Sequence, residues 1–174
     1  MKNMFEVRGN IAVIFLDRKD GTTIETIIDL DDLAKAQEYS GNWFASWSKC
    51  TKSFYVYGSV LIEEGKWIVI LLHRWIMDTP SNLQVDHRNH NTLDNTRNNL
   101  RNVSRSVNNQ NQKGLNNHNT SGVRGVHWLK SSKKWQAYLT INGKQIHLGL
   151  FTDIQLAARA AHEARVKLMP GYVY

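Results

Sequence analysis

Cysteine and long apolar runs are both scarce in this chain of 174 residues. Cys50 is the only cysteine, so no internal disulfide can form and a zinc ribbon made of several cysteines is excluded. The most apolar run, Trp67–Leu72, is far too short to cross a bilayer. The first residues, Met1–Glu6, lack the apolar segment of a signal peptide. We therefore expect an intracellular protein in a reducing setting, with no membrane partner.

Acidic residues are fewer than basic ones, 15 against 22, and the imbalance is confined to one end of the chain. Residues 113–174 contain nine Lys and Arg but only two acidic residues, Asp153 and Glu163, which accounts for the whole net charge of +7. Residues 1–112 therefore sum to zero. This one-sided distribution is typical of a dedicated module that binds a polyanion.

Residues 1–66 have the pattern of a small β-rich module. Ile11–Leu16 and Thr22–Ile28 are rich in β-branched residues, and the Asp20-Gly21 pair between them favours a hairpin. A short helix should follow, with Asp29 or Asp31 as its cap.

Six aromatic residues then occur close together, interleaved with lysines: Trp43, Phe44, Trp47, Phe54, Tyr55 and Tyr57. Such a mixture could form a base-stacking surface. Strand aromatics more often fill a core, because they bury large areas, and we favour that interpretation.

Residues 67–112 have the pattern of a second module. Trp67–Leu72 indicates a buried strand, His73–Met77 a short helical turn, and Leu100–Val103 a further short strand. Between this helical turn and the strand Leu100–Val103, the segment Leu83–Val85 leads directly into Asp86-His87. A polar loop rich in Asn, Asp and Arg follows the pair. Ser104 should cap a helix over residues 105–112.

Four polar residues in this module, Asp86, His87, Asn99 and Asn108, suit the hydrolysis of a phosphodiester. Histidine can take the proton from water, and a hard divalent cation needs oxygen ligands, which Asp86 and Asn108 can provide. Because neighbours on a regular strand point to opposite faces, the strand must end or bend at His87. Asn99 is the natural candidate to hold the loop that follows.

Together these residues resemble the HNH nuclease motif, in particular that of HNH homing endonucleases encoded by phages and mobile introns. The resemblance is carried by Val85–His87, by Asn98–Arg101, by Asn108 and by the upstream segment Leu72–Trp75. It implies a ββα-metal fold with His87 as general base, Asn99 as the residue that orients the loop of the base, and Asp86 and Asn108 as ligands of one Mg²⁺, or alternatively Mn²⁺. The last residue of the motif, often histidine, is asparagine here.

Other basic residues near the motif could contact phosphates close to the scissile bond: His73, Arg74, Arg88, Arg97 and Arg101. For His73 the alternative is a packed histidine beside a buried strand. For the arginines the alternative is a solvated loop.

The C-terminal part, residues 121–174, follows a polar, Gly- and Asn-rich linker at residues 113–120. Strand patterns cover Val123–Leu129, Trp135–Ile141 and Gln145–Phe151, and Asn142-Gly143 is a strong hairpin turn. Asp153 should cap a helix over residues 154–168, with inner apolar positions at Leu156, Ala157, Ala160, Ala161, Ala164 and Leu168.

This part resembles the DNA-binding domain of plant ethylene-response factors of the Apetala type. The resemblance is carried by Val123–Val126, Lys134–Ala137, His147–Phe151 and Ala157–Ala161. It implies a three-stranded antiparallel sheet that enters the DNA major groove, backed by one helix.

Strand alternation then divides the side chains of the sheet between its two faces. Ala137, Leu139, Ile141, Ile146 and Leu148 should face the helix, and Trp135 should pack in the core. The candidate DNA contacts are Arg124, His127, Lys130, Lys133, Lys134, Gln136, Tyr138, Thr140, Gln145 and His147. A solvated turn is the alternative for the three lysines.

The sequence thus predicts an α+β chain composed of a β-rich N-terminal module, a central ββα-metal unit and a C-terminal sheet on one helix. The predicted function is a metal-dependent endonuclease of double-stranded DNA, of the homing type, encoded by a phage or mobile element and acting in a bacterial cytoplasm. No small-molecule cofactor besides the metal is expected, and a monomer is slightly favoured. The alternative from another class is a non-catalytic transcriptional regulator with a structural HNH unit. RNA is disfavoured as substrate, since the deep groove of A-form RNA does not admit such a sheet.

Overall fold

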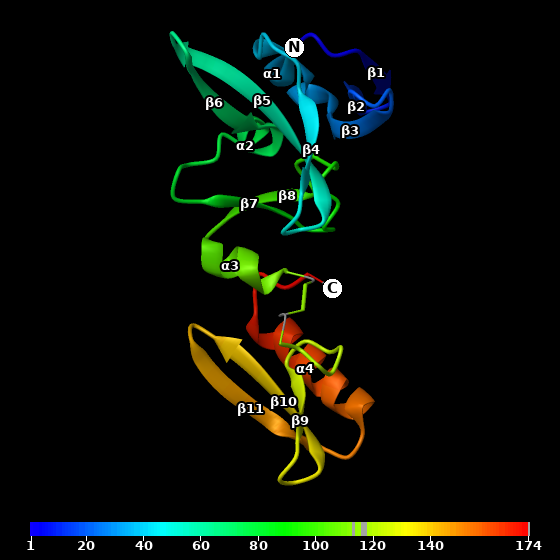
Figure 1. The fold of residues 1–174 in the computed structure, drawn as a ribbon, viewed down its shortest axis with the longest axis vertical. Coiled ribbons are helices and arrows are strands. Elements are labelled where there is room, and N and C mark those ends of the chain that lie inside the picture. Colours follow the sequence, from blue (N-terminus) through cyan, green and yellow to red (C-terminus); the bar gives the residue numbers. More distant parts are fainter. Residues whose placement is uncertain (113, 116–117, 174) are drawn as a thin grey trace. The chain divides into compact units, whose positions relative to one another are not determined.

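The computed structural model describes residues 1–112, 114–115 and 118–173. The chain forms two compact units, Met1–Ser104 and Arg105–Tyr174, which we call the first and second unit. Both are built from small antiparallel sheets and a few helices, so the fold class is α+β (Figure 1). Among the described residues, no helix is long and apolar enough to span a membrane.

The first unit contains two three-stranded antiparallel sheets and a two-stranded one. Its elements are β1 (Phe5–Arg8), β2 (Ile11–Asp17), β3 (Thr23–Asp29), η1 (Leu30–Asp32), α1 (Leu33–Glu38), β4 (Phe44–Ser48), β5 (Ser53–Glu63), β6 (Lys66–Leu71), α2 (Leu72–Ile76), β7 (Gln84–His87) and β8 (Leu100–Val103). The predicted hairpin is confirmed as β2–β3, and β8 has the predicted bounds. The predicted helical turn after the apolar run is α2.

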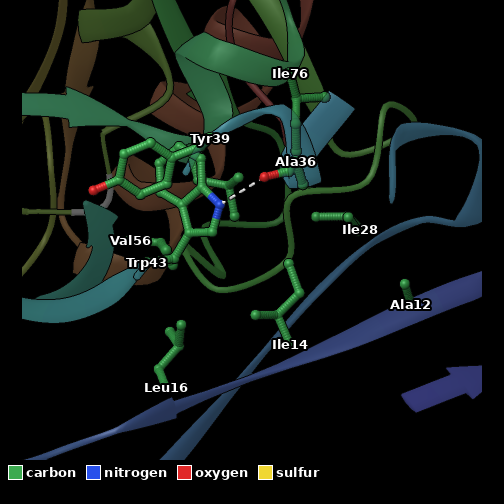
Figure 2. Close-up of a cluster of buried hydrophobic side chains, with 10 residues drawn as sticks. Ala12, Ile14, Leu16, Ile28, Ala36, Tyr39, Trp43, Val56 and Ile76 are labelled. Atoms are coloured by element: carbon green, nitrogen blue, oxygen red, sulfur yellow. Dashed lines mark hydrogen bonds between the residues drawn. The ribbon is translucent and has the colours of Figure 1, made fainter. Parts of the chain in front are cut away.

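One core joins β2, β3, α1, α2 and β5 of the first unit. Trp43 lies at its centre, packs against Tyr39 and donates a hydrogen bond from Nε1 to the Ala36 carbonyl at 3.2 Å (Figure 2). The other buried members of this apolar cluster are Ala12, Ile14, Leu16, Ile28, Val56, Leu72 and Ile76. Because α2 is anchored here, the chain entering β7 starts from a fixed position.

Three expectations about burial and capping in the first unit are wrong. Trp67 and Val69 of β6 are 62% and 65% exposed, because β6 is the edge strand of the sheet β4-β5-β6; only Leu72, on α2, is fully buried. Trp47 is 51% exposed and Phe44 also faces outward, so the core interpretation holds for Trp43 but not for these two. Asp29 precedes η1 but makes no capping bond; its carboxylate accepts from the backbone N–H of Arg97 at 2.7 Å.

The second unit contains α3 (Arg105–Gln110), β9 (Val126–Leu129), β10 (Lys134–Ile141), β11 (Lys144–Phe151) and α4 (Ile154–Leu168). The sheet order is β11-β10-β9, and α4 packs across it through Ala157 and Ala161 (Figure 1). Asn142 and Gly143 have φ of 50° and 76°, as a two-residue hairpin turn requires, and the Asp153 side chain caps α4 by accepting from two backbone N–H groups. These two predictions are confirmed.

Several predicted details of the second unit differ from the structure. The first strand begins at Val126 rather than Val123, because Gly125 turns the chain with φ of 75° and lies so close to the Tyr138 carbonyl that a Cβ would be 2.5 Å from it. Leu156, Leu168 and Ile146 are exposed, whereas Arg165 is buried beside the two alanines on the inner stripe of α4. Helix α3 ends at Gln110 instead of Gln112. Lys113, Asn116 and Asn117 of the predicted linker lie outside the described residues.

Candidate functional site

The strand β7 ends at the Asp86-His87 pair, and both side chains are only 6% exposed. Antiparallel pairing with β8 sets His87 opposite Leu100 and Asp86 opposite Arg101. Beyond His87 the ladder closes with one bond, from the Arg88 N–H to the Asn99 carbonyl at 2.8 Å. The regular strand therefore ends directly after the Asp86-His87 pair, as the sequence pattern requires if both side chains are to face one site.

The Asp86 carboxylate is held by its cross-strand neighbour. Arg101 donates from Nε at 2.8 Å and approaches with Nη2 at 2.6 Å, both toward Oδ2, and both side chains are largely buried. Arg101 therefore compensates a buried negative charge, which would be costly without a partner. Its guanidinium is used within the hairpin, rather than extended as a separate phosphate contact.

The imidazole of His87 is buried and hydrogen-bonded. Its Nε2 lies 3.3 Å from Oδ1 of Asn95. Burial lowers the pKa of His87 below its usual 6.5, and this outweighs the Asn95 bond and the charges of Asp86 and Asp94, which act in the opposite direction. His87 is therefore neutral near pH 7, the form that can accept a proton.

His73, on α2, packs its ring almost perpendicular to that of His87, with 5.1 Å between ring centroids, and also contacts Tyr55. Burial, His87 and Arg74 lower the pKa of His73 to about 3. The ring is thus uncharged at neutral pH and supports His87 by packing. This geometry is that of the packed histidine, the alternative to a phosphate contact.

Asn99 binds the loop between β7 and β8 from across its open end. Its Oδ1 accepts from the Asn89 N–H at 2.9 Å, and its Nδ2 donates to the carbonyl of Asp94 at 2.7 Å. A longer bond of 3.4 Å reaches the Asn91 carbonyl. These contacts are the ones expected of a residue that orients the loop following His87.

Asn95 was not singled out by the sequence, although it contacts the imidazole of His87 directly. It is 1% exposed, and its Nδ2 donates to Oγ1 of Thr26 on β3 at 2.9 Å. One asparagine among many in a polar loop gives no local signal. Only the return of the loop to β3, marked by a parallel bridge between Ile27 and Asp94, makes this position distinctive.

The remaining candidate phosphate contacts near the site have different environments. Arg74 donates to three carbonyls of the turn before β7, those of Thr79, Pro80 and Leu83. Arg97 pairs with the buried Asp32 at 2.6 Å. Arg88 is exposed. Of the four arginines proposed from the sequence, Arg88 and Arg97 are exposed, and Arg97 is engaged with Asp32.

Asn108 lies half-buried on α3 and so belongs to the second unit. Its pairing with Asp86 as a second ligand stays a prediction. The donor set itself, one carboxylate and one amide oxygen, fits Mg²⁺, which keeps several waters and commonly uses one or two carboxylates together with substrate phosphate. In the described residues there is no group of three or more His, Cys, Asp or Glu side chains that could hold a metal by itself, so a contribution from substrate is part of this interpretation.

A second candidate site is the face of the β9–β11 sheet opposite α4, which we call the outer face. The register pairs Gln136 with His127, Tyr138 with His147 and Thr140 with Gln145, so these six side chains share one face as predicted. Ala137 and Leu139 are buried on the other face, and Trp135 packs against the core there. The outer face thus offers donors, acceptors and aromatic edges in one surface.

Contacts within this outer face order its side chains. Nε2 of Gln136 and Nδ1 of His147 are 3.0 Å apart, and the ring of His127 meets that of Tyr138 edge to face at 5.4 Å. Lys130, Lys133 and Lys134 are exposed at the turn between β9 and β10.

Arg124, also a candidate DNA contact, is hydrogen-bonded to the backbone at the end of α3. Its guanidinium donates to the carbonyls of Asn109, Gln110 and Gln112 at and just beyond the C-terminal end of α3. These carbonyls have no partner inside the helix, so Arg124 satisfies them.

Comparison with protein families, with curated proteins and with solved structures finds no match to this chain. The fold is established as α+β with small antiparallel sheets. Any assignment of function therefore depends on the geometry of the two candidate sites and on the resemblance of their motifs.

Proposed function

We propose that this protein is a metal-dependent endonuclease of the HNH type that hydrolyses phosphodiester bonds in double-stranded DNA. The observation that supports it most is the end of β7, where a buried carboxylate and a buried, neutral imidazole are adjacent and the following loop is tied down by Asn99.

In this proposal His87 is the general base. A neutral imidazole accepts the proton of the attacking water, and the lowered pKa of His87 keeps it in that form at neutral pH. The ring of His73 fixes one side of His87 by packing, and Asn95 fixes its Nε2 edge. Such restraint favours attack, because the base need not be ordered during the reaction.

Asp86 is the proposed carboxylate ligand of one Mg²⁺, and the amide oxygen of Asn108 is the proposed second donor. When bound, the metal ion would neutralise the phosphate and stabilise the leaving oxygen. Arg101 holds the carboxylate through two donors to Oδ2, at 2.6 and 2.8 Å, in a buried position.

The outer face of the second unit is the proposed DNA contact that positions the cut. His127, Tyr138, Thr140, Gln145 and His147 would face the major groove, and the lysines at the β9–β10 turn would contact phosphates. A homing role and an origin in a phage or mobile element in a bacterial cell follow from the resemblance of the motif. One site per chain makes nicking the simpler outcome for a monomer.

Cleavage of supercoiled plasmid by the purified full chain tests this proposal. We expect relaxed or linear product with Mg²⁺ or Mn²⁺ and none with EDTA, since the chemistry requires the cation. An Asp86→Asn variant, which keeps the shape of the side chain but loses its charge, should lose most of the activity. Intact plasmid under every metal condition would exclude the nuclease.

One observation favours a second candidate, a DNA-binding regulator in which the hairpin is only structural. The pairing of Asp86 with Arg101 is what a purely structural β7–β8 hairpin would also use. In that case Mg²⁺ would have no effect on DNA, while binding would persist. The plasmid experiment combined with a gel-shift measurement therefore separates the two functions.

The lysines at the β9–β10 turn yield a prediction about salt. Replacing Lys130, Lys133 and Lys134 by Gln should reduce the steepness of log K against log salt by roughly 2 to 3, because each phosphate contact contributes about 0.9. Affinity should be measured by fluorescence anisotropy at several salt concentrations. The control removes three exposed lysines of the first unit, Lys2, Lys19 and Lys49. An equal change of slope in both variants would show only a nonspecific effect of net charge.

A further inference from the structure

Three buried polar side chains form a hydrogen-bonded chain that begins on β3 and ends at the imidazole of His87. Thr26 is fully buried, Asn95 is 1% exposed and His87 is 6% exposed. Thr26 Oγ1 lies 2.7 Å from the Leu93 carbonyl, Asn95 Nδ2 lies 2.9 Å from Thr26 Oγ1, and Asn95 Oδ1 lies 3.3 Å from His87 Nε2. Thr26 is far from the motif in the sequence.

The donor and acceptor in each of these hydrogen bonds follow from the bond between the Thr26 hydroxyl and the Leu93 carbonyl. A carbonyl oxygen only accepts, so the single hydroxyl hydrogen of Thr26 is used in the contact with Leu93. Thr26 must then accept from its other neighbour, which requires the NH₂ group of Asn95 on that side. The amide oxygen of Asn95 is thereby turned toward His87 and can only accept, so the proton of the neutral imidazole lies on Nε2.

The backbone holds this chain of side chains in register. The Ile27 N–H donates to the Leu93 carbonyl at 3.0 Å, and the Asn95 N–H donates to the Ile27 carbonyl at 2.8 Å. The loop segment 93–95 is therefore attached to β3 like a short parallel strand. Neither Thr26 nor Asn95 can move away from the other without breaking these bonds.

We infer that Thr26 and Asn95 are positioning residues that set the tautomer of His87, placing its proton on Nε2 and its lone pair on Nδ1. This inference depends on the proposed function for its catalytic meaning, since the lone pair is what would accept the proton of water. The N-terminal strands would thus contribute to the chemistry, through Thr26, without contacting substrate. The alternative is that both residues only stabilise the loop.

Thr26→Val tests the inference, because valine has nearly the same shape but can neither donate nor accept. Asn95 then loses the partner that sets its orientation, and its NH₂ group can turn toward His87. We expect nitrogen NMR of His87 at mildly alkaline pH to show a substantial population with the proton on Nδ1. In the same variant kcat should fall by about 10–100-fold with KM retained, as is common when a group that orients a site residue is lost. Thr26→Ser keeps the hydroxyl and should restore both readouts.

A second variant keeps the inference testable if Thr26→Val does not fold. In Asn95→Asp the carboxylate accepts in either orientation, so His87 should keep its proton on Nε2 whatever occupies position 26. A proton on Nδ1 in Asn95→Asp, or wild-type nitrogen shifts and kcat in a folded Thr26→Val, would overturn the inference and leave the nuclease proposal standing. Conversely, an Nε2 proton in a wild-type chain that cleaves no DNA would overturn the nuclease and leave the hydrogen-bonded chain intact.

Discussion

His87→Ala is expected to lower kcat for DNA cleavage by about 10²–10⁴-fold, the range typical of removing a general base. Binding of DNA should be nearly unchanged, because the outer face of the β9–β11 sheet lies in the second unit. The reason is the state of the ring: His87 is buried and neutral, so its replacement removes the proposed general base at the end of β7. Single-turnover cleavage and anisotropy on the same DNA measure the two quantities.

His162→Ala is the matched control, since His162 is an exposed histidine on α4. Its removal should change neither quantity by more than a small factor. Cleavage by His87→Ala at the wild-type rate would contradict the assignment of the base, even if wild-type activity requires Mg²⁺.

The pH dependence of the wild-type rate examines the same residue. Burial lowers the pKa of His87, and the active form is the neutral one. The cleavage rate should therefore rise with pH, with a midpoint at an apparent pKa below 6.5. Above this pKa the rate should become constant, because His87 is then fully neutral. A midpoint well above 6.5 would mean that the base is another group or that His87 is exposed in the complex with DNA.

Elements with strong local signals were predictable from the sequence. Asn142-Gly143 is one such case, because two adjacent residues with positive φ define the turn. Asp153 is another, since a capping side chain needs only the N–H groups of the next residues. The exposure of side chains could not be predicted from the local sequence. Trp67–Leu72 has the composition of a buried strand, yet β6 lies at the edge of its sheet. Nothing in a short apolar run distinguishes an edge strand from a central one.

The residues of the candidate site also fall into two groups, those that the sequence pattern identified and those that only the fold brings together. Asp86, His87 and Asn99 could be proposed because their order and spacing in the chain carry the pattern. Asn95 could not, since its importance comes from Thr26, which is distant in sequence and close only after the loop returns to β3. Charge pairing was equally hidden. Arg97 was a candidate phosphate contact, but the folded chain places it against the buried carboxylate of Asp32.

Since the hydrogen-bonded chain to His87 begins on β3, the core beneath β3 should matter for activity as well as for stability. Trp43→Ala is expected to destabilise the first unit by about 3–5 kcal/mol, the usual cost of truncating a fully buried tryptophan. Trp43 packs against Tyr39 and Trp75, with ring centroids 4.6 and 6.4 Å away, and its Nε1 bonds to the Ala36 carbonyl. Against a total stability of about 5–15 kcal/mol for a domain, such a loss leaves little reserve.

Trp47→Ala provides a control of identical chemistry, because Trp47 is 51% exposed and rests only against Phe54 among its aromatic neighbours in the described residues. Its replacement should cost no more than about 1 kcal/mol. Urea unfolding followed by circular dichroism compares the two variants, and cleavage assays near the midpoint of Trp43→Ala compare their activities. We expect that variant to lose cleavage as the first unit unfolds, while the second unit still binds DNA. Equal urea midpoints for both variants would mean that the cluster around Trp43 is not the core that holds β3. The hydrogen bonds from Thr26 through Asn95 to His87 would then not depend on this core.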